Sequence, residues 1–346
     1  MHRYDRRILV TGGCGNIGSA VARRLVQDPA NWVTIVDDLS TGYLSHLPDR
    51  RLPNWRYVKL NVNSFGDLSS VMTSTPFDAV FHYAAVVGVQ RTLANPLAVL
   101  RDIDGIRNIL DLSKNTGVKR VFYSSSSEVY GEPVEFPQNE LTTPLNSKLP
   151  YAIVKNLGES YFKSYEREYG LPYTIFRLFN TYGPRQSDDF VLPKMVEAAM
   201  AGHALPIHGD GMQTRTFCYI EDHVDFTMKV FYDLLFINDT VNVGSSQEIT
   251  ILDLARLIIA RVGGSSRIVH LPALTEGDMT RRCPDNAKMR AVLGRDLMPL
   301  PEGIDAVIAS KIGDPRRCTS SSSATNSPAI GTTASVSSLI ESPAAQ

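Results

Sequence analysis

The sequence lacks long apolar segments. No run of about 18 apolar residues, the length needed to span a membrane, occurs in the 346 residues. The strand-like run at residues 8–10, which follows a polar start, is far too short for the apolar core of a signal peptide. We therefore expect a cytoplasmic protein that does not enter a membrane.

Cysteine is scarce and the charges are balanced. Cys14, Cys218, Cys283 and Cys318 lack the spacing of a metal site or a disulfide framework, so we expect reduced thiols and no metal. The net charge is −1, without the basic surplus that favours nucleic acids or anionic membranes as partners. The composition, 43% hydrophobic and 21% charged, is that of a soluble globular protein. Its length allows a large α/β domain with a smaller partner, or two ordinary domains.

The first 180 residues alternate short apolar runs with longer helical patterns. Several runs are apolar on both sides, as are strands that helices cover on both faces. The alternation predicts an α/β fold with a Rossmann-type, doubly wound parallel sheet. The expected strands are residues 8–11, 33–37, 57–60, 79–83, 120–124 and 173–178, and the expected helices are residues 17–27, 97–116 and 152–169.

Beyond residue 180 the pattern loosens into Gly- and Pro-rich loops. Helical pieces at 191–201 and 251–262 and a strand-like run at 240–243 predict a smaller α/β substrate domain, interleaved with the sheet domain. The sheet domain is predicted at 1–180 with a returning segment at about 217–245, and the second domain at 181–216 and 246–312. Residues 316–346 are rich in Ser, Thr and Ala with few large apolar side chains, so we expect a disordered tail.

A glycine-rich turn follows the first expected strand and opens the first expected helix. It contains Gly12, Gly15 and Gly18, with Asn16 and Ile17 between the last two. Glycine adopts backbone angles that a β-carbon would forbid, and the turn brings backbone N–H groups to a pyrophosphate at the positive end of the helix. With a strand before it and a helix after it, this turn predicts a dinucleotide-binding site.

Two acidic residues, Asp37 and Asp38, end the second expected strand. A carboxylate at this place accepts hydrogen bonds from the ribose hydroxyls and repels a 2′-phosphate, so we expect NAD rather than NADP as the cofactor. Polar and small residues after the third and fourth strands fit the paths of the adenine and the nicotinamide. These further cofactor-binding candidates are Asn61, Val62, Ala84 and Ala85.

Tyr151 and Lys155 form the only Tyr-x-x-x-Lys pair in the chain. Residues four apart share one face of a helix. An ammonium group beside a phenol lowers the tyrosine pKa from about 10 toward the working pH. Tyr151 is therefore a candidate general base or acid at a sugar or alcohol oxygen, with Lys155 as its partner and a cofactor ligand.

A serine-rich loop, residues 124–131, follows the fifth expected strand. The carboxyl ends of strands are where open α/β sheets bind their ligands. A hydroxyl in this loop can hydrogen-bond the same substrate oxygen that Tyr151 deprotonates. We therefore expect Ser126, Ser127 and Glu128 to belong to the catalytic site.

With these residues in place, the chain resembles the extended short-chain dehydrogenase/reductase family, specifically its NAD-dependent nucleotide-sugar epimerases, dehydratases and decarboxylases. The resemblance covers about residues 6–310. It places Ser126 on the family's catalytic Ser/Thr, Tyr151 on its base and Lys155 on its ribose-binding lysine. It implies NAD as cofactor and a nucleotide sugar, with UDP as the nucleotide, as substrate.

Two later segments resemble the parts of this family that hold the nucleotide sugar. Residues 179–185, Phe-Asn-Thr-Tyr-Gly-Pro-Arg, look like the segment that joins the domains, and residues 209–222 are similar to the diphosphate motif. Arg215 would be the diphosphate ligand, since the planar guanidinium suits phosphate oxygens. The substrate-binding residues that the resemblance implies are Ser126, Tyr151, Asn180, Arg185, Gln213, Arg215 and Arg282.

The resemblance implies that Tyr151 takes the proton of the sugar 4-hydroxyl while hydride passes from C4 to NAD⁺. The 4-keto sugar can then accept the hydride on its other face, lose water across C5–C6, or lose CO₂ where C6 is a carboxylate. Family dehydratases carry Asp-Glu where this chain has Ser127 and Glu128, which disfavours dehydration. Decarboxylases carry Thr-Ser-Glu and Arg-x-Pro-Asp segments, and residues 126–128 and 282–285 are close to both, but residues 152–154 lack their Asp-Glu-Gly.

Epimerases tolerate varied residues between the Tyr and the Lys, and many distant ones share the Ser-Ser-Ser-Glu loop. Arg282 falls where sugar 4-epimerases carry a residue that restricts the sugar, and an arginine would crowd an N-acetyl group and attract a C6 carboxylate. We therefore predict a UDP-sugar C4 epimerase acting on UDP-glucuronate or UDP-glucose. The alternative is a UDP-glucuronate decarboxylase that forms UDP-xylose; a 4,6-dehydratase and a non-catalytic NAD-binding regulator are lesser alternatives.

The expected helices 97–116 and 152–169 carry apolar stripes beyond what one face of a sheet needs. Members of the family pair such helices into a four-helix interface between subunits. The resemblance therefore implies a homodimer.

Overall fold

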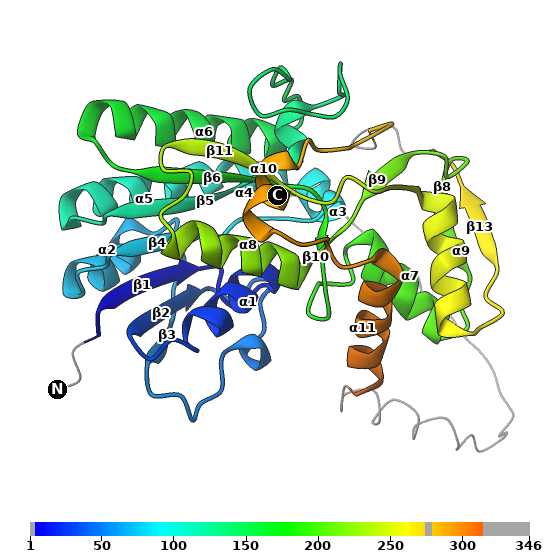
Figure 1. Ribbon diagram of the computed structural model, residues 1–346, viewed down its shortest axis with the longest axis horizontal. Coiled ribbons are helices and arrows are strands. Elements are labelled where there is room, and N and C mark those ends of the chain that lie inside the picture. Colours follow the sequence, from blue (N-terminus) through cyan, green and yellow to red (C-terminus); the bar gives the residue numbers. More distant parts are fainter. Residues whose placement is uncertain (1–3, 274–278, 314–346) are drawn as a thin grey trace, which may run out of the picture.

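A seven-stranded parallel sheet forms the centre of the computed structural model, which describes residues 4–273 and 279–313 (Figure 1). Its strand order is β11-β6-β5-β4-β1-β2-β3, and every neighbouring pair is parallel. The order reverses between β1 and β4, and ligands of such sheets bind in the crevice at that reversal. The strands are β1 (Arg6–Thr11), β2 (Asn31–Asp37), β3 (Trp55–Lys59), β4 (Ala79–His82), β5 (Arg120–Ser126), β6 (Tyr173–Leu178) and β11 (Asp239–Val243).

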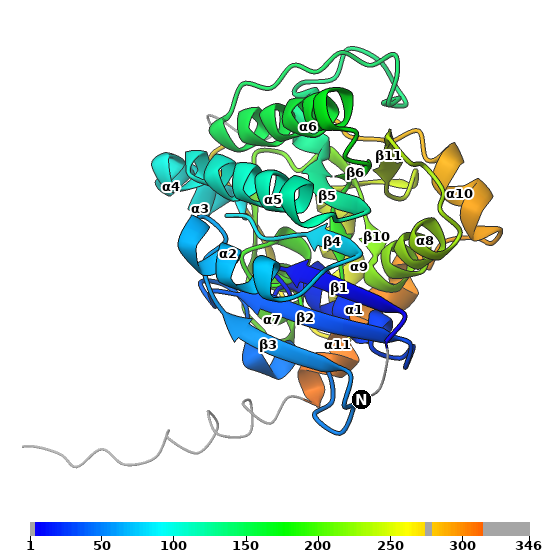
Figure 2. The ribbon, with the colours of Figure 1, turned by 90° about the vertical axis from the view of Figure 1, so that its left-hand side faces the viewer.

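Helices cover both faces of this sheet (Figure 2). On one face α1 (Asn16–Leu25) and α8 (Ile220–Tyr232) pack side by side, and on the other α2 (Phe65–Ser74), α5 (Asp102–Thr116) and α6 (Pro150–Tyr169) do so. The sheet therefore separates two apolar clusters, and all four residues of β4 are buried. This arrangement confirms the predicted doubly wound α/β fold.

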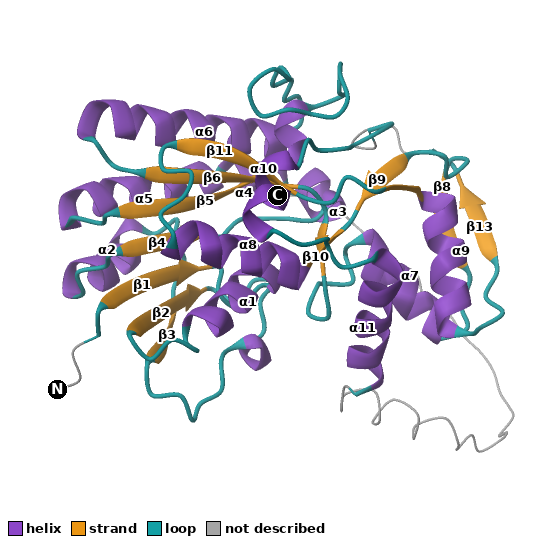
Figure 3. Ribbon diagram, viewed as in Figure 1, coloured by secondary structure: helices purple, strands orange, loops and turns teal. Residues whose placement is uncertain are grey.

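A second group of elements lies beyond the carboxyl ends of the strands (Figure 3). It contains a parallel pair, β8 and β13, and an antiparallel pair, β9 and β12. A third pair, β7 and β10, joins this group to the sheet region, and the chain then returns to the sheet through α8 and β11. The elements are β7 (Thr181–Tyr182), α7 (Val191–Met200), β8 (Leu205–His208), β9 (Thr214–Thr216), β10 (Cys218–Tyr219), β12 (Glu248–Thr250), α9 (Ile251–Val262), β13 (Ile268–Leu271) and α11 (Leu300–Ile312). The helix α10 (Ala287–Leu293) instead packs on α8 and β11.

Two predicted elements differ in the structure. The single helix expected at 97–116 is two helices, α4 (Pro96–Leu100) and α5, with a turn at Arg101. Asp102 is the first residue of α5, and its carboxylate accepts a hydrogen bond from the Val86 backbone N–H at 2.7 Å. The serine loop is also shorter than expected, because β5 continues to Ser126 and the next residues form the 3-10 helix η2 (Ser127–Tyr130).

Several helices were not expected from the sequence pattern: α2, α3 (Val89–Ala94), α8, α10 and α11, besides the short 3-10 helix η1 (Leu44–His46). The segment Phe65–Ser74 contains four Ser or Thr residues, which are weak helix formers. Its first turn is stabilised by the Ser64 side chain, which accepts from the Asp67 N–H. The predicted domain boundaries stay a prediction, and the tail 316–346 lies outside the described residues.

In the part of the chain that the structure describes, no helix combines the length and the apolar content that crossing a bilayer requires. Cys14, Cys218 and Cys283 are buried free thiols, and Cys318 lies outside the described ranges. The cytoplasmic location stays a prediction.

Candidate active site

A cleft of about 730 Å³ opens at the carboxyl edge of the sheet, between the sheet and the second group of elements. Every predicted site residue except Lys155 lines it. These are Gly12, Gly15, Asn16, Ile17, Gly18, Asp37, Asp38, Asn61, Val62, Ala84, Ala85, Ser126, Ser127, Glu128, Tyr151, Asn180, Arg185, Gln213, Arg215 and Arg282.

The glycine turn between β1 and α1 is shaped by close backbone approaches. Gly12 has φ of +65°, in the left-handed region that favours glycine, and a Cβ there would lie 2.6 Å from the backbone N of Ala84. A Cβ on Gly18 would overlap the carbonyl oxygen of Gly12. The turn therefore packs directly against the end of β4 and the start of α1, and its glycines border the cleft. A glycine turn at the start of a helix fits the diphosphate of a dinucleotide.

We expect Gly18→Ala to weaken NAD binding by about tenfold to a hundredfold, since the new methyl group forces the turn away from α1. Titration of the purified protein with NAD measures this. Gly66→Ala on α2 is the matched control, because no atom lies within 4 Å of its added Cβ. An unchanged affinity in Gly18→Ala would contradict this view of the turn.

Asp37 ends β2 beside the glycine turn. Its two carboxylate oxygens accept hydrogen bonds from the backbone N–H groups of Cys14 (2.9 Å) and Leu39 (2.8 Å). Burial raises the pKa of Asp37, and these two hydrogen bonds oppose that rise. Each oxygen keeps a second lone pair, so the carboxylate can hold the turn and accept a ribose hydroxyl together. Asp38, its neighbour, accepts from the Ser40 N–H at 2.8 Å.

Tyr151 and Lys155 lie in the first two turns of α6, next to the end of β5. The Lys155 ammonium lies behind the cleft wall, donates to the Ser124 carbonyl at 2.7 Å and is 5.7 Å from the centre of the Tyr151 ring. Burial raises the pKa of Tyr151, the Glu128 charge raises it further, and hydrogen bonding with Ser126 opposes the rise. The expectation that Lys155 brings this pKa below 10 is therefore not met in the structure, because burial dominates.

Burial lowers the pKa of Lys155 to about 8, while the charge of Asp102 raises it. Asp102 begins α5 and lines the cleft, and the sequence analysis did not single it out. An acidic residue in the first turn of a helix is so common that its position alone carries no functional signal. The negative charge of Asp102 thus favours the protonated form of Lys155.

In Asp102→Asn we expect the alkaline limb of the kcat/KM profile to move to lower pH. Asparagine keeps an oxygen for the Val86 N–H but loses the negative charge, so the pKa of Lys155 falls further and its ammonium loses its proton earlier as pH rises. A pH–rate profile measures the shift. Asp104→Asn, at an exposed position of the same helix, is the control, and an unmoved limb in Asp102→Asn would contradict this role.

Glu128 and Arg282 form an ion pair of 2.7 Å inside the cleft. Their side chains are only 14% and 7% exposed, so the pair is shielded from solvent on most sides. The Ser126 hydroxyl accepts from the Glu128 N–H at 3.2 Å, and the charges of both members of the pair influence Tyr151. The structure thus brings the serine loop, Tyr151 and Arg282 together, although Arg282 is distant in the sequence.

Asn180 and Arg215 also line the cleft. Asn180 has φ of +38°, a region in which Asn is enriched, and its side-chain amide donates to the Thr216 carbonyl at 2.9 Å. Arg215 is 8% exposed and donates to the Thr214 carbonyl at 2.7 Å. Arg215 lies on β9, which pairs with β12. The side chain of Gln213, just before β9, donates to the His208 carbonyl at 3.2 Å.

Arg185 lies farther toward the glycine turn than expected for a substrate ligand. It donates to the carbonyl of His46 at 2.9 Å, and Arg23 of α1 donates to the same oxygen at 3.1 Å. The His46 ring in turn is 2.9 Å from the carbonyl of Cys14. Arg185 therefore ties the segment after β7 to the loop that covers the glycine turn, and His46 is a cleft residue that the sequence analysis missed.

The sequence matches the family model described as "NAD dependent epimerase/dehydratase family" over residues 8–244. It is 36% identical to the UDP-N-acetyl-alpha-D-glucosaminuronate decarboxylase of Bacillus cytotoxicus, over 77% of this chain and 84% of the relative. It is 32% identical to UDP-glucuronic acid decarboxylase 1 of Danio rerio, over 88% of this chain and 72% of the relative. The crystal structure of the Thermotoga maritima UDP-glucose 4-epimerase with UDP-glucose superposes with a TM-score of 0.83 at 29% identity, covering 90% of this chain and 99% of that chain.

Proposed function

The chain belongs to the NAD-dependent epimerase/dehydratase family, and on this premise we propose that it oxidises a UDP-hexuronate at C4 and removes the C6 carboxylate as CO₂. It is an enzyme of the extended short-chain dehydrogenase/reductase type, with NAD as its cofactor. The ion pair between Glu128 and Arg282 in the cleft carries the choice of substrate and reaction. The similarity to decarboxylases also supports decarboxylation, and for this reason we now prefer a decarboxylase to the epimerase predicted from the sequence.

The residues that line the cleft fit NAD. Gly12 and Gly18 border the cleft where the glycine turn meets α1 and would hold the diphosphate, and the Asp37 carboxylate retains lone pairs for a ribose. Lys155 would hold the ribose next to the nicotinamide. When bound, NAD⁺ would supply the acceptor for a hydride from C4 and, later in the cycle, the donor that returns it. The remaining predicted cofactor contacts are Gly15, Asn16, Ile17, Asp38, Asn61, Val62, Ala84 and Ala85.

In the first half-reaction Tyr151, as phenolate, accepts the proton of the C4 hydroxyl, and Ser126 hydrogen-bonds the same oxygen. The C4–H bond breaks with its electron pair leaving as hydride, which produces a C4 ketone. A C6 carboxylate is then β to that ketone. Arg215 and Asn180, which also line the cleft, hold the nucleotide part and so orient C4 toward Tyr151.

In the second step the C5–C6 bond breaks, CO₂ leaves, and the electron pair moves into a C4 enolate. The protonated Tyr151 and the Ser126 hydroxyl stabilise that oxyanion by hydrogen bonds. A proton from water adds to C5 and produces a 4-keto pentose. Return of the proton from Tyr151 to O4, with the hydride that the cofactor would supply to C4, completes a UDP-pentose. Arg282 supplies the guanidinium that binds the uronate carboxylate, and it returns to Glu128 after CO₂ has left.

NMR of the purified protein with NAD and, separately, UDP-glucuronate, UDP-N-acetylglucosaminuronate, UDP-glucose and UDP-N-acetylglucosamine tests the proposal. We expect a UDP-pentose or a 4-keto pentose from a uronate, with release of CO₂. If the product is UDP-galacturonate or UDP-galactose, the enzyme is a C4 epimerase and the proposal of decarboxylation is wrong. No change in any sugar would overturn both reactions.

C4 epimerisation of UDP-glucuronate or UDP-glucose is the second candidate. Residues Ala152, Ile153 and Val154, between the catalytic Tyr and Lys, differ from the Asp-Glu-Gly that the decarboxylase resemblance implies. The Thermotoga maritima epimerase also covers most of the chain. The first half-reaction is the same, so only the products separate the two candidates.

We also propose that the protein is a homodimer. Five large apolar side chains on α3, α4 and α6 are 40% to 71% exposed, although these helices pack on one another. Isolated exposed leucines are ordinary, but a group on adjoining helices marks an interaction surface. The five are Leu93, Leu97, Leu100, Ile153 and Leu157.

We expect the double variant Leu97→Lys and Leu157→Lys to be monomeric, while the wild-type chain has the mass of a dimer at micromolar concentration. Light scattering coupled to size-exclusion chromatography measures both. Leu141→Lys is the control, since Leu141 is 83% exposed on the separate loop before α6. A monomeric wild-type protein would contradict the proposal.

A further inference from the structure

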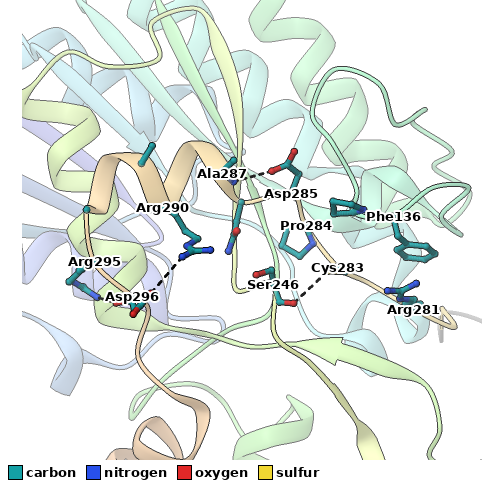
Figure 4. Close-up of a pocket in the computed structure, with 14 residues that line it drawn as sticks. Phe136, Ser246, Arg281, Cys283, Pro284, Asp285, Ala287, Arg290, Arg295 and Asp296 are labelled. Atoms are coloured by element: carbon teal, nitrogen blue, oxygen red, sulfur yellow. Dashed lines mark hydrogen bonds and ion pairs between the residues drawn. The ribbon is translucent and has the colours of Figure 1, made fainter.

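The segment 281–286 separates two cavities. Arg282 lines the catalytic cleft, whereas its neighbours Arg281 and Cys283 border an open hollow of about 910 Å³ on the outer side. Figure 4 shows Cys283, Pro284 and Asp285 along the wall of this hollow. Arg282, Cys283, Pro284 and Asn286 are nevertheless buried. Hydrogen bonds from buried side chains fix the backbone of this segment and with it the position of Arg282.

Gln138, in the connection between β5 and α6, binds this segment on both sides of Pro284. Its N–H donates to the Cys283 carbonyl at 2.7 Å, and its side-chain oxygen accepts from the Cys283 N–H at 3.2 Å. Its carbonyl accepts from the Asp285 N–H at 2.8 Å. Gln138 is fully buried, so these bonds have no competition from water.

Asn242 of β11 joins the two partners. Its side-chain amide donates to the carbonyls of Gln138 (2.8 Å) and Asp285 (3.3 Å), and its side-chain oxygen accepts from the Tyr130 hydroxyl at 2.8 Å. Asn242 is also fully buried. The NH₂ group of the Asn242 amide thus binds the segment 281–286 and its partner Gln138, and the amide oxygen binds Tyr130 of the 3-10 helix η2.

The same network continues to the catalytic helix. Arg177 of β6 donates to the Tyr130 hydroxyl at 2.9 Å and forms a buried ion pair of 2.7 Å with Glu159 of α6. The Ser125 hydroxyl donates to Glu159 at 2.6 Å. Asn242 is thus linked through buried polar side chains to β5 and α6, the two elements that present Ser126 and Tyr151.

We propose that Asn242, together with Gln138, is a positioning residue that sets Arg282 at the distance from Tyr151 that a uronate carboxylate requires. Neither side chain lines the cleft, so each acts through the segment 281–286 rather than on the substrate. This inference rests on the proposed function, in which Arg282 binds that carboxylate. It assigns substrate selectivity to a buried network outside the cleft.

The test compares KM for UDP-glucuronate with the affinity for UDP-glucose, which lacks the carboxylate. Asn242→Asp keeps the size of the side chain but replaces the donating amide by an oxygen that faces two carbonyls. We expect it to raise KM for UDP-glucuronate by about tenfold and to leave NAD content and the affinity for UDP-glucose unchanged. Equal losses for both sugars would mean a merely structural role and overturn the proposal.

Asn242→Asp introduces a carboxylate at a buried position, so a second pair of variants tests the proposal without adding a charge at residue 242. Gln138→Met removes the acceptor for the Cys283 N–H, and Gln138→Glu retains one. We expect the methionine variant to show the same selective rise in KM and the glutamate variant to recover most of the wild-type value. Thr142→Ala, exposed on the same connection and bonded to Glu135, is the control. Wild-type selectivity in both Asn242→Asp and Gln138→Met would overturn the proposal.

Arg282→Gln, measured alongside, separates this inference from the proposed function. If Arg282→Gln loses selectivity for UDP-glucuronate while the Asn242 and Gln138 variants keep it, the positioning role alone fails. If Arg282→Gln has no selective effect either, the proposed role of Arg282 fails as well.

Discussion

Tyr151→Phe is expected to lower kcat by about 10³-fold and to leave NAD binding intact. The phenylalanine ring keeps the packing of Tyr151 against the end of β5 but has no oxygen to accept the C4 proton. Burial and the Glu128 charge raise the pKa of this phenol above its usual value of about 10. Because Tyr151 must lose its proton to act as the base, we expect the rate of the wild-type enzyme to rise with pH.

Single-turnover formation of reduced cofactor, followed by absorbance, measures the first half-reaction directly. Tyr161→Phe is the matched control, since Tyr161 lies on the same helix, is partly buried and does not line the cleft. Turnover near the wild-type level in Tyr151→Phe, with NAD bound, would assign the proton transfer to another group. A loss of bound NAD instead would mean that the ring supports the cofactor site.

Arg282→Gln is expected to lower kcat/KM for UDP-glucuronate by about a hundredfold or more. The same change leaves Glu128 as an unpaired carboxylate in a site where it is only 14% exposed. Breaking a buried pair by removing one partner costs on the order of 3–5 kcal/mol, discounted here by the partial access to the cleft. We therefore expect a lower melting temperature for Arg282→Gln as well.

The double variant Arg282→Gln with Glu128→Gln separates the two effects. Removing both charges should restore much of the melting temperature but not the turnover of the uronate, since the carboxylate still lacks its guanidinium. Arg281→Gln is the control, because Arg281 is adjacent, exposed and paired with Glu248 outside the cleft. Equal loss of activity on UDP-glucose and UDP-glucuronate would contradict a carboxylate-binding role for Arg282.

Local patterns in the sequence predicted the sheet, the family and the cofactor. The glycine turn and the strand and helix around it are contiguous, so spacing alone reveals them. Tyr151 and Lys155 are four residues apart on one helix, and the same reasoning applies. The glycine turn and the Tyr151–Lys155 pair each consist of residues close together in the sequence, so their spacing can be recognised without the structure.

The contacts that join distant segments could not be predicted in this way. Asn242 and Gln138 are about a hundred residues apart, and Arg185 meets a carbonyl at His46 from a still greater separation. A backbone carbonyl has no sequence signature, so neither contact leaves a pattern. The pKa of Tyr151 was misjudged for a related reason, because burial is set by the assembled cleft and not by the residue four positions away.

The bond from Arg185 to the His46 carbonyl has a consequence for how the enzyme uses its cofactor. The loop that it holds lies against the glycine turn, where the His46 ring contacts the Cys14 carbonyl, and we expect this contact to help retain the cofactor between turnovers. In the proposed reaction the hydride returns to the sugar within the same cycle. We therefore expect a catalyst that withdraws no reducing equivalents from the cell, whose rate is insensitive to the ratio of oxidised to reduced nicotinamide around it.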